Sequence, residues 1–520
     1  MSKKVRVRFA PSPTGPLHIG GVRTALFNYL FAKKHGGDFV LRIEDTDQTR
    51  YVEGAENYIV EALNWLNIPF DEGVDKEGKF GPYRQSERKH LYKEYADQLI
   101  ASGNAYYAFD TSEELNAMRK EYEVEKKTFI YNWHNRKSLN NSLALSSEEV
   151  NSKLEAGENY VIRFKTPINE ILQLKDIIRG NVQIDTNVLD DKVLFKSDGM
   201  PTYHLANIVD DHLMEISHVI RGEEWLPSMA LHILLYSSLG WNAPEFAHLP
   251  LIMKPVGKGK LSKRDGDKMG FPVFPIEWKT AEGDLFSGYR EDGYLPEAVI
   301  NMLALLGWNP GTEQEIFSLD ALIEAFDLSR VNKAGAKFDP DKTKWFQNHY
   351  LQEQSNEELV ELFFPILNDK LDVIQSIGEE SQEISRYTRN DNELLIKIVG
   401  LLKERATFVS DLWELGDFFF IAPELYNEKA SKKAFKEDTP EILKKVVALL
   451  KETNGFSSKE ISEKIKGWVT AQEMGFGKVM MPLRLALVGE MKGPDVFDIA
   501  SILGKEETIS RIEKAIEYMG

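Results

Sequence analysis

The sequence predicts a parallel α/β domain that carries an insertion and is followed by an all-helical C-terminal third. Three observations predict this order: a strand–helix–strand pattern near the start, a change to Glu- and Lys-rich helical segments from about residue 82, and the loss of strand patterns after about residue 339. At 520 residues the chain is too long for one hydrophobic core. We therefore expect about three to five domains.

A βαβ unit is predicted within the first 50 residues. Residues 5–9 alternate as a strand, residues 10–21 hold three prolines and three glycines, residues 22–34 have apolar side chains at helical spacing, and residues 39–43 form a short apolar strand. Such a unit builds a parallel sheet with a right-handed crossover, and its ligands bind at the carboxyl ends of the strands. The Pro/Gly loop and an acidic cluster after residue 43 both lie at such ends.

Residues 82–198 are predicted to be an insertion, because helical segments alternate with polar stretches there before strand patterns resume at residues 193–195 and 215–220. The C-terminal third is predicted to be all-helical from three amphipathic segments, at residues 393–409, 441–450 and 508–518. These changes divide the chain into segments 1–81, 82–198, 199–270, 271–338 and 339–520.

The composition excludes several kinds of protein. No run of about 18 apolar residues occurs, so we expect no membrane span. The basic start leads into an alternating strand instead of an apolar signal core, so we expect a cytoplasmic protein. The chain has no cysteine, which excludes disulfides, thiolate nucleophiles and cysteine-ligated zinc. Its net charge of −18 argues against binding nucleic acid through bulk positive charge but allows a local basic surface.

The loop at residues 11–21 is a candidate phosphate site. Its glycines let the backbone approach phosphates, the following helix offers free N–H groups, and His18 can donate a hydrogen bond to a phosphate oxygen. Many strand–helix turns contain glycines for purely steric reasons, so this loop alone does not establish a phosphate site.

A cationic segment at residues 258–266 is the second candidate. Four of its first seven residues are Lys or Arg, in an otherwise acidic chain. Charge runs are usually solvated surface. The flanking glycines favour a mobile loop instead, and mobile lysines can neutralise charge that develops on ATP phosphates in a transition state.

Together the two motifs resemble the HIGH and KMSKS elements of class I aminoacyl-tRNA synthetases. They read His18-Ile19-Gly20-Gly21 and Lys260-Leu261-Ser262-Lys263-Arg264. The fourth position of the first motif is glycine instead of histidine, which is the usual form in the glutamyl family. Residues 8–15, 41–47, 197–207 and 219–225 are also similar to the glutamyl and glutaminyl group. The helical C-terminal third resembles the bacterial-type glutamyl enzymes, whereas glutaminyl enzymes carry β-barrels there.

The resemblance implies an α/β Rossmann-like catalytic domain with an α/β insertion, followed by an all-helical C-terminal anticodon-binding region. In order, the five segments become the first half of the catalytic domain, an insertion that binds the acceptor end, the second half with the KLSKR loop, a connecting helical domain that contacts the stem, and the anticodon-binding region. The implied activity is glutamate–tRNA ligation for protein synthesis. ATP activates L-glutamate to glutamyl-adenylate, and the terminal ribose of tRNA(Glu) takes the glutamyl group, giving AMP and pyrophosphate.

The resemblance also implies which residues carry the chemistry. The implied catalytic residues are His18, Lys260 and Lys263. The implied ATP-binding residues are His18, Gly20, Gly21, Glu224, Lys260, Leu261, Ser262, Lys263 and Arg264. The implied glutamate-binding residues are Arg8, Ser12, Glu44, Tyr203, Asn207 and Arg221. Arginine forks suit the two substrate carboxylates and Glu44 suits the ammonium, but which arginine takes the side-chain carboxylate stays open.

Each glutamate-site residue has a structural alternative. Arg8 can instead pair with Asp45, Glu44 can bond to backbone, Tyr203 can be half-buried core, and Arg221 can cap a turn. Residues of these types at strand ends are common in proteins without such a site.

We expect no resident metal, because Mg²⁺ arrives with ATP, and no structural zinc, because residues 106–110 lack the cysteine cluster of related enzymes. Members of the family are commonly monomers. Arg405 is the predicted anticodon contact, with Arg484 and Phe408 as further candidates, although aromatic residues such as Phe408 and Trp413 are more often helix core than nucleic-acid contacts.

Three rival functions remain. A glutaminyl-tRNA synthetase is disfavoured by the helical C-terminal third. A tRNA-binding scaffold without catalysis is disfavoured by the intact His18, Lys263, Arg8 and Glu44. A nucleotidylyltransferase that does not act on tRNA leaves the C-terminal third without a role.

Overall fold

In the computed structural model of the chain, residues 4–377 and 392–520 are described, and the side chains of Lys263, Asp267 and residues 374–377 lie outside the description. The chain forms two compact units. The first, the α/β unit, is Met1–Asp292 with Pro296–Thr343, and the second, the helical unit, is Gly293–Leu295 with Lys344–Gly520. The predicted order of a parallel α/β part and a helical C-terminal part is confirmed.

The α/β unit is built on parallel strands that begin with the predicted βαβ unit. Strands β1 (Arg6–Phe9), β2 (Asp38–Leu41) and β3 (Glu72–Gly73) pair in parallel in that order, and α1 (Ile19–Lys34) connects the first two. Helix α1 is buried on most of its surface, which agrees with its nearly continuous apolar sequence.

A second sheet continues the first. Its order is β7 (Gly180–Asp185), β6 (Ile171–Asp176), β10 (Glu245–Leu249) and β9 (His218–Gly222), with β10 parallel to both β6 and β9. The two sheets meet where Ser217 and Arg6 exchange hydrogen bonds. The hairpin β6–β7 falls within the range predicted as an insertion, yet it pairs with β10 and so extends the main sheet.

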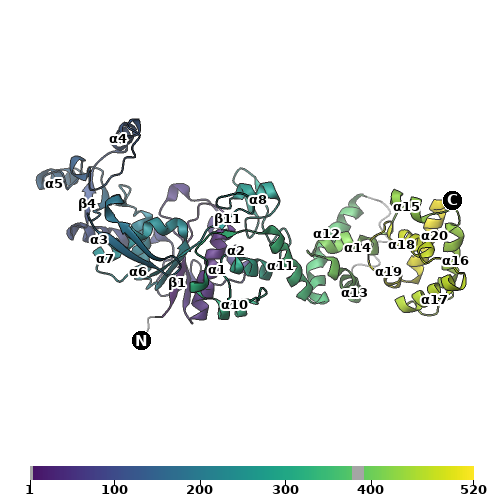
Figure 1. Ribbon diagram of the computed structural model, residues 1–520. Coiled ribbons are helices and arrows are strands. Elements are labelled where there is room, and N and C mark those ends of the chain that lie inside the picture. The colour runs from purple at the N-terminus through teal and green to yellow at the C-terminus, as the bar shows by residue number, and fades with distance from the viewer. Residues whose placement is uncertain (1–3, 378–391) are drawn as a thin grey trace. The chain divides into compact units, whose positions relative to one another are not determined.

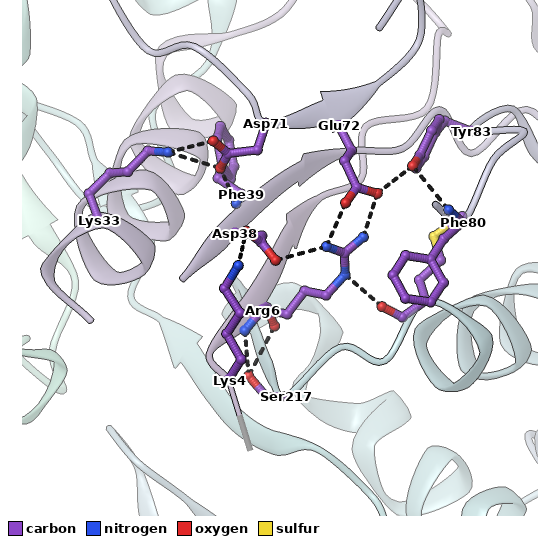
Figure 2. A network of polar contacts seen from close by, with 11 residues as sticks. Lys4, Arg6, Lys33, Asp38, Phe39, Asp71, Glu72, Phe80, Tyr83 and Ser217 are labelled. Atoms are coloured by element: carbon purple, nitrogen blue, oxygen red, sulfur yellow. Dashed lines mark hydrogen bonds and ion pairs between the residues drawn. The ribbon is translucent and has the colours of Figure 1, made fainter. Parts of the chain in front are cut away.

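The amino ends of β1, β2 and β3 are tied together by Arg6, as Figure 2 shows. Its guanidinium donates to Asp38 at 3.1 Å and to Glu72 at 3.0 and 2.7 Å, and it lies over the ring of Phe80. The hydrogen bond from Arg6 is the main reason that the pKa of Glu72 is lowered. This network fixes the end of the sheet opposite to the carboxyl ends.

A separate antiparallel sheet forms the rest of the predicted insertion. It consists of β4 (Ala105–Ala108), β5 (Val161–Phe164) and β8 (Val193–Phe195). Helices α4 (Ser112–Val124) and α5 (Ser147–Glu155) belong to it, and in Figure 1 they project from the unit at the end away from α8 and α10. Both helices begin with a capping box of Thr or Ser with Glu.

The remaining elements of the α/β unit surround these sheets. The helices are α2 (Ala55–Trp65), α3 (Lys89–Ala101), α6 (Tyr203–Leu213), α7 (Met229–Ser238), α8 (Lys263–Met269), α9 (Pro296–Leu305) and α10 (Leu319–Ala325). Two-residue strands pair as β11 (Ile252–Met253) with β14 (Ala336–Lys337), and as β12 (Trp278–Lys279) with β13 (Leu285–Phe286).

The described part of the helical unit has no strand. Its helices are α11 (Pro340–Glu353), α12 (Asn356–Ile377), α13 (Asn392–Leu402), α14 (Asp411–Gly416), α15 (Glu428–Ala434), α16 (Thr439–Lys451), α17 (Ser458–Ala471), α18 (Gly477–Val488), α19 (Val496–Leu503) and α20 (Lys505–Met519). Within residues 4–377 and 392–520, no helix is both long and apolar enough to cross a bilayer.

Two predicted elements differ in extent. The strand predicted at residues 215–220 starts at His218, because Glu215 has a left-handed backbone (φ 58°) that turns the chain. The helix predicted at residues 393–409 ends at Leu402, and the side chain of Asp411 accepts hydrogen bonds from the backbone N–H groups of Thr407 and Phe408 in the turn that follows.

Candidate functional site

A cavity of about 650 Å³ opens at the carboxyl ends of β1 and β9. All six residues predicted to bind glutamate line it, as do seven of the nine predicted ATP residues: His18, Gly20, Gly21, Glu224, Lys260, Leu261 and Ser262. Arg264 is exposed and is not among the lining residues, and the side chain of Lys263 lies outside the described part. Segments far apart in the sequence therefore share one cavity.

Arg8 belongs to a buried charge network behind the cavity. Its Nε donates to Asp211 at 3.0 Å, and the same carboxylate oxygen lies 2.8 Å from Arg42 Nη1. Arg42 also bonds to Glu44 at 2.8 Å. The alternative partner Asp45 is not used, since its carboxylate accepts from the backbone of Ser86. Arg8 is thus fixed on one side by a shared carboxylate while it lines the cavity on the other.

Glu44 lies three residues after the end of β2, and two hydrogen-bond donors hold its side chain. Arg42 Nη2 and Asn207 Nδ2 both lie 2.8 Å from its Oε1. Glu44 is 6% exposed and lines the cavity. A carboxylate has about four acceptor positions, so Glu44 can still accept hydrogen bonds from an ammonium group placed in the cavity.

Arg221 differs from Arg8, because no carboxylate forms an ion pair with it in the described ranges of the chain. It lies near the carboxyl end of β9, and its Nη1 donates to the hydroxyl of Tyr203 at 3.1 Å. Its Nη2 also donates to the backbone carbonyl of Trp225 at 3.3 Å. Arg221 therefore also caps the turn after β9, which is the structural alternative considered for it, in addition to lining the cavity. The ring of Tyr203 packs on Trp225 with centroids 4.2 Å apart. The charge of Arg221 therefore faces the cavity without a protein counter-charge.

His18 is the N-cap of α1. Its Nδ1 accepts a hydrogen bond from the backbone N–H of Gly20 at 3.1 Å, so the proton of the neutral ring is on Nε2. Nε2 is buried and has no partner among the described residues. Burial, and then the charge of Lys260, lower the pKa of His18 to about 4. At neutral pH the ring therefore offers an uncommitted N–H donor at the start of a helix.

The KLSKR segment, residues 260–264, follows β11 in the chain and runs into the first turn of α8, which begins at Lys263. Leu261 is 2% exposed and its N–H donates to Ile252 O at 2.8 Å, which anchors the segment. Exposed Lys260 lies 3.4 Å from Glu224 across the cavity entrance. Ser262 caps α8 in a capping box with Asp265. The segment thus has one buried anchor, Leu261, and exposed cations at Lys260 and Arg264.

A pH dependence of stability follows from His18 and His204. Burial is the main reason that both have a pKa of about 4, against 6.5 in the unfolded chain. The unfolded state binds more protons below pH 6.5, so stability is complete above 6.5 and is lost as the pH falls. We expect urea titrations between pH 6.5 and 5 to show a loss whose slope rises toward about 1.4 kcal/mol per pH unit for each histidine as the pH approaches 5. In His204→Gln the slope of unfolding free energy against pH should decrease by the contribution of one histidine. An unchanged slope would mean that His204 does not have a lowered pKa in the folded protein.

Two residues of this site were not predicted from the sequence. They are Arg42 and Asp211, which are both buried and form an ion pair with each other. Asp211 also pairs with Arg8, and Arg42 with Glu44, so the two residues position the side chains of the site. One signal was available: Asp211 lies four residues after Asn207, on the same face of a helix whose other residues on that face are buried. A carboxylate at such a position needs a buried partner.

The anticodon candidates lie in the helical unit. Arg405 is exposed at the end of a short 3-10 helix (Lys403–Arg405). Arg484 is half-buried and donates a hydrogen bond to Lys492 O at 2.8 Å. Burial, and to a smaller extent the charge of Arg405, lower the pKa of Arg484, although Asp495 acts in the opposite direction. Phe408 packs edge-on against Tyr294, and Trp413 is 8% exposed, so the latter is core. Arg405 is thus the more accessible of the two arginines.

The segment considered for zinc is held by aromatic and polar contacts. Tyr106 donates to Asp191 at 2.7 Å and Tyr131 to Asp110 at 2.8 Å. Tyr106 and Tyr131 share an apolar cluster with Leu115. Within the described ranges, no group of three or more His, Cys, Asp or Glu side chains is arranged to hold a metal ion.

Comparison with protein families gives two matches along the chain. The family described as tRNA synthetases class I (E and Q), catalytic domain, matches residues 4–345. The family described as anticodon binding domain matches residues 358–516.

Individual proteins are similar over the whole length. A glutamate–tRNA ligase of Christiangramia forsetii is 65% identical over 520 residues, which is 100% of both chains, and one of Flavobacterium johnsoniae is 65% identical over 519 residues, again 100% of both. A crystal structure of a glutamate tRNA ligase from Elizabethkingia meningosepticum, in complex with its amino acid, is 55% identical with a TM-score of 0.95 and covers 100% of both chains.

Proposed function

Because the chain belongs to the glutamate–tRNA ligase family of class I tRNA synthetases, we propose that it joins L-glutamate to tRNA(Glu) at the expense of ATP. The observation that carries this proposal is the single cavity lined by Arg8, Glu44 and Arg221 together with His18 and Lys260. Two cations and one anion match the charges of glutamate, and the other two residues suit phosphates.

The proposed glutamate site uses the residues at the strand ends. Arg8 and Arg221 bind the two substrate carboxylates, and Glu44 binds the ammonium. Tyr203, Asn207 and Ser12 add neutral contacts or shape around the bound amino acid. The support is that Arg221 has no protein counter-ion in the described chain and that Glu44 keeps free acceptor positions.

The proposed ATP site uses the two motifs. His18 Nε2–H and the backbone at Gly20 and Gly21 hold phosphate oxygens, which the N-terminus of α1 favours. A side chain at Gly21 would collide with Leu17, since an added Cβ would lie 2.5 Å from its Cδ1. Lys260 and Lys263, with Leu261, Ser262 and Arg264, complete the site, and Glu224 lies near the nucleoside. Mg²⁺ enters with the phosphates, which with water supply most of its oxygens.

The reaction proceeds in two displacements. An oxygen of the substrate α-carboxylate attacks the α-phosphorus of ATP, and pyrophosphate leaves with the bonding electrons. The terminal ribose hydroxyl of the tRNA then attacks the carbonyl carbon of glutamyl-adenylate and gives up its proton, while AMP leaves with the electrons of the acyl–phosphate bond. The enzyme contributes position and charge stabilisation without a covalent intermediate.

The other segments are proposed to hold the tRNA. The insertion at residues 82–198 takes the acceptor end, residues 271–338 contact the stem, and residues 339–520 bind the anticodon. We expect the enzyme to act as a cytoplasmic monomer. With a net charge of −18, the cations that contact tRNA must gather on one face, and binding must weaken with salt.

Charging of bacterial tRNA with labelled glutamate or glutamine, with ATP and Mg²⁺ present, tests the proposal. We expect incorporation of glutamate that collapses in Lys263→Ala. Incorporation of glutamine alone would favour the glutaminyl alternative. If neither is incorporated but tRNA binds, the chain is a tRNA-binding scaffold and the proposed reaction is wrong.

The proposed role of Arg405 predicts a salt effect. Arg405→Gln removes one cation from the exposed surface, so tRNA should bind more weakly and the slope of log K against log salt should decrease by about 0.7–0.9. Filter binding between 50 and 200 mM salt, the range over which such contacts weaken, measures both. Lys4→Gln is the control, because Lys4 pairs with Asp38 at the opposite end of the sheet from the cavity. If the slope of log K against log salt is the same for both variants and for the unaltered enzyme, Arg405 does not contact the tRNA.

A further inference from the structure

Two buried histidines support Arg221 from behind. His248 on β10 pairs in register with Arg221 on β9, and its Nε2 accepts a hydrogen bond from Arg221 Nε at 3.0 Å. His232 on α7 lies on another side, with its Nδ1 3.4 Å from Arg221 Nη1. Their exposed fractions are 0% and 1%. Arg221 therefore meets imidazole rings on its protein side and the cavity on the other.

The hydrogen positions on His248 follow from Asp176. Asp176 Oδ2 lies 2.7 Å from His248 Nδ1, and a carboxylate can only accept, so Nδ1 carries the proton and Nε2 is the acceptor. Asp176 is itself fixed at the end of β6, where its Oδ1 accepts from the backbone N–H groups of Ile178 and Arg179 at 2.9 and 2.8 Å. The tautomer of His248 is thus set by a carboxylate that cannot rotate freely.

A similar chain fixes His232. Its Nδ1 accepts from Arg221, which leaves the proton on Nε2, and that nitrogen lies 3.2 Å from His204 Nδ1. Burial lowers the pKa of both His232 and His248. Each ring is therefore a neutral acceptor toward the guanidinium.

A neutral imidazole can orient a guanidinium without cancelling its charge, whereas a carboxylate does both. Arg8 and Arg42 are positioned by Asp211, which also cancels part of their charge. Arg221 is positioned by hydrogen bonds with His248, His232 and the hydroxyl of Tyr203, which orient the fork but leave its positive charge to the ligand.

We propose that His248 and His232 are positioning residues for glutamate binding, which hold the Arg221 fork toward the substrate carboxylate without neutralising it, and that Asp176 sets the tautomer of His248. This proposal rests on the proposed function, because it assumes that the ligand of Arg221 is a carboxylate of glutamate.

The test compares two polar replacements of His248. Glutamine places its side-chain oxygen near the position of Nε2 and can still accept from Arg221, whereas asparagine reaches only the position of Nδ1 and keeps the contact with Asp176 alone. We expect His248→Asn to raise the KM for glutamate by about 10- to 100-fold, as loss of a residue that supports a binding group does. His248→Gln should stay within about threefold of the unaltered enzyme, and the KM for ATP should change little in both.

The matched control is His218→Asn. His218 starts the same strand as Arg221 but contacts Ser217 and Glu245 instead, so its replacement should leave both KM values unchanged. Thermal unfolding is measured on every variant. If His248→Asn does not fold, the pair is made at His232, where the order reverses: asparagine keeps the Nδ1 contact and glutamine loses it.

The outcomes separate this proposal from the proposed function. If the unaltered enzyme incorporates no glutamate, the proposed function fails and the positioning role with it. If it does incorporate glutamate, an unchanged glutamate KM in the variant that loses the Arg221 contact overturns the positioning role alone. Equal losses in the Asn and Gln variants, with the KM for ATP raised in parallel, would also overturn it, because a general packing defect produces that result.

Discussion

Asp211→Asn is expected to lower the free energy of unfolding by about 3–5 kcal/mol at pH 7, the cost of leaving a buried charge without its partner. Asp211 is 2% exposed and shares one carboxylate oxygen between Arg8 and Arg42. Asparagine has nearly the same shape but no charge, so buried Arg8 loses the carboxylate that it bonds to, and Arg42 keeps only Glu44 as a bonded carboxylate. Urea unfolding followed by tryptophan fluorescence measures the loss.

The same substitution should weaken glutamate binding, because the amide oxygen of asparagine can accept only a weaker, uncharged hydrogen bond from Arg8, which then holds that arginine less firmly toward the cavity. We expect the KM for glutamate to rise about tenfold and the KM for ATP to stay near its original value. The matched control is the neighbouring Asp210, which is 0% exposed and bonds to Arg88 at 2.7 Å instead. Asp210→Asn should lose comparable stability and keep its glutamate KM. If both variants lose glutamate binding equally, the Asp211 network is a stability feature only.

The effect of Asp211 has a defined pH range. Burial alone would raise the pKa of Asp211, but Arg8 and Arg42 outweigh burial and lower it below 3.8. Its contribution to stability is therefore complete above the pKa of the unfolded chain and is lost as the pH falls through the lower folded value. The stability gap between the enzyme and Asp211→Asn should shrink only in that acid range, and a gap that closes near pH 6 would point to another group.

The sequence predicted well those features that local pattern determines. The Pro/Gly loop, the helix after it and the strand ends follow from residues close together in the chain, and they bring Ser12, His18 and Glu44 to one cavity. The same reasoning could not identify the partner of Arg8, because Asp211 lies 203 positions away. Asp45, the partner considered from sequence proximity, is used instead to hold the backbone of Ser86.

Element ends were less predictable for a physical reason. Apolar periodicity continues past Leu402 into Phe408 and Val409, but there the chain forms a turn that Asp411 stabilises, with Val409 buried and Phe408 half-buried. Likewise, residues 171–185 fall within the range 82–198, which was predicted to be an insertion because helical and polar stretches alternate there before strand patterns resume at residue 193. Their pairing with β10 depends on a residue far along the chain, Phe246. Local propensity cannot report such contacts.

His18→Asn is expected to reduce kcat/KM for ATP in glutamate activation by about 10²–10³-fold, the usual effect of removing one donor to developing charge. Asparagine is a good N-cap and can still accept from the N–H of Gly20, as His18 Nδ1 does at 3.1 Å. It has no donor at the position of Nε2, which is the buried nitrogen without a partner in the described chain. The fold should therefore be kept while the donor is lost.

His18→Gln is the matched variant, because its amide N–H can occupy the position of Nε2 while its capping contact with Gly20 is lost. If the donor carries the effect, glutamine should be more active than asparagine although it is less stable. If capping carries the effect, the order should be the reverse. The pH profile gives an independent check: with a pKa of about 4, His18 stays neutral from pH 6 to 8. Replacing it should therefore lower the rate by the same factor across that range, and a factor that changes near pH 6.5 would mean that the ring titrates as an ordinary histidine.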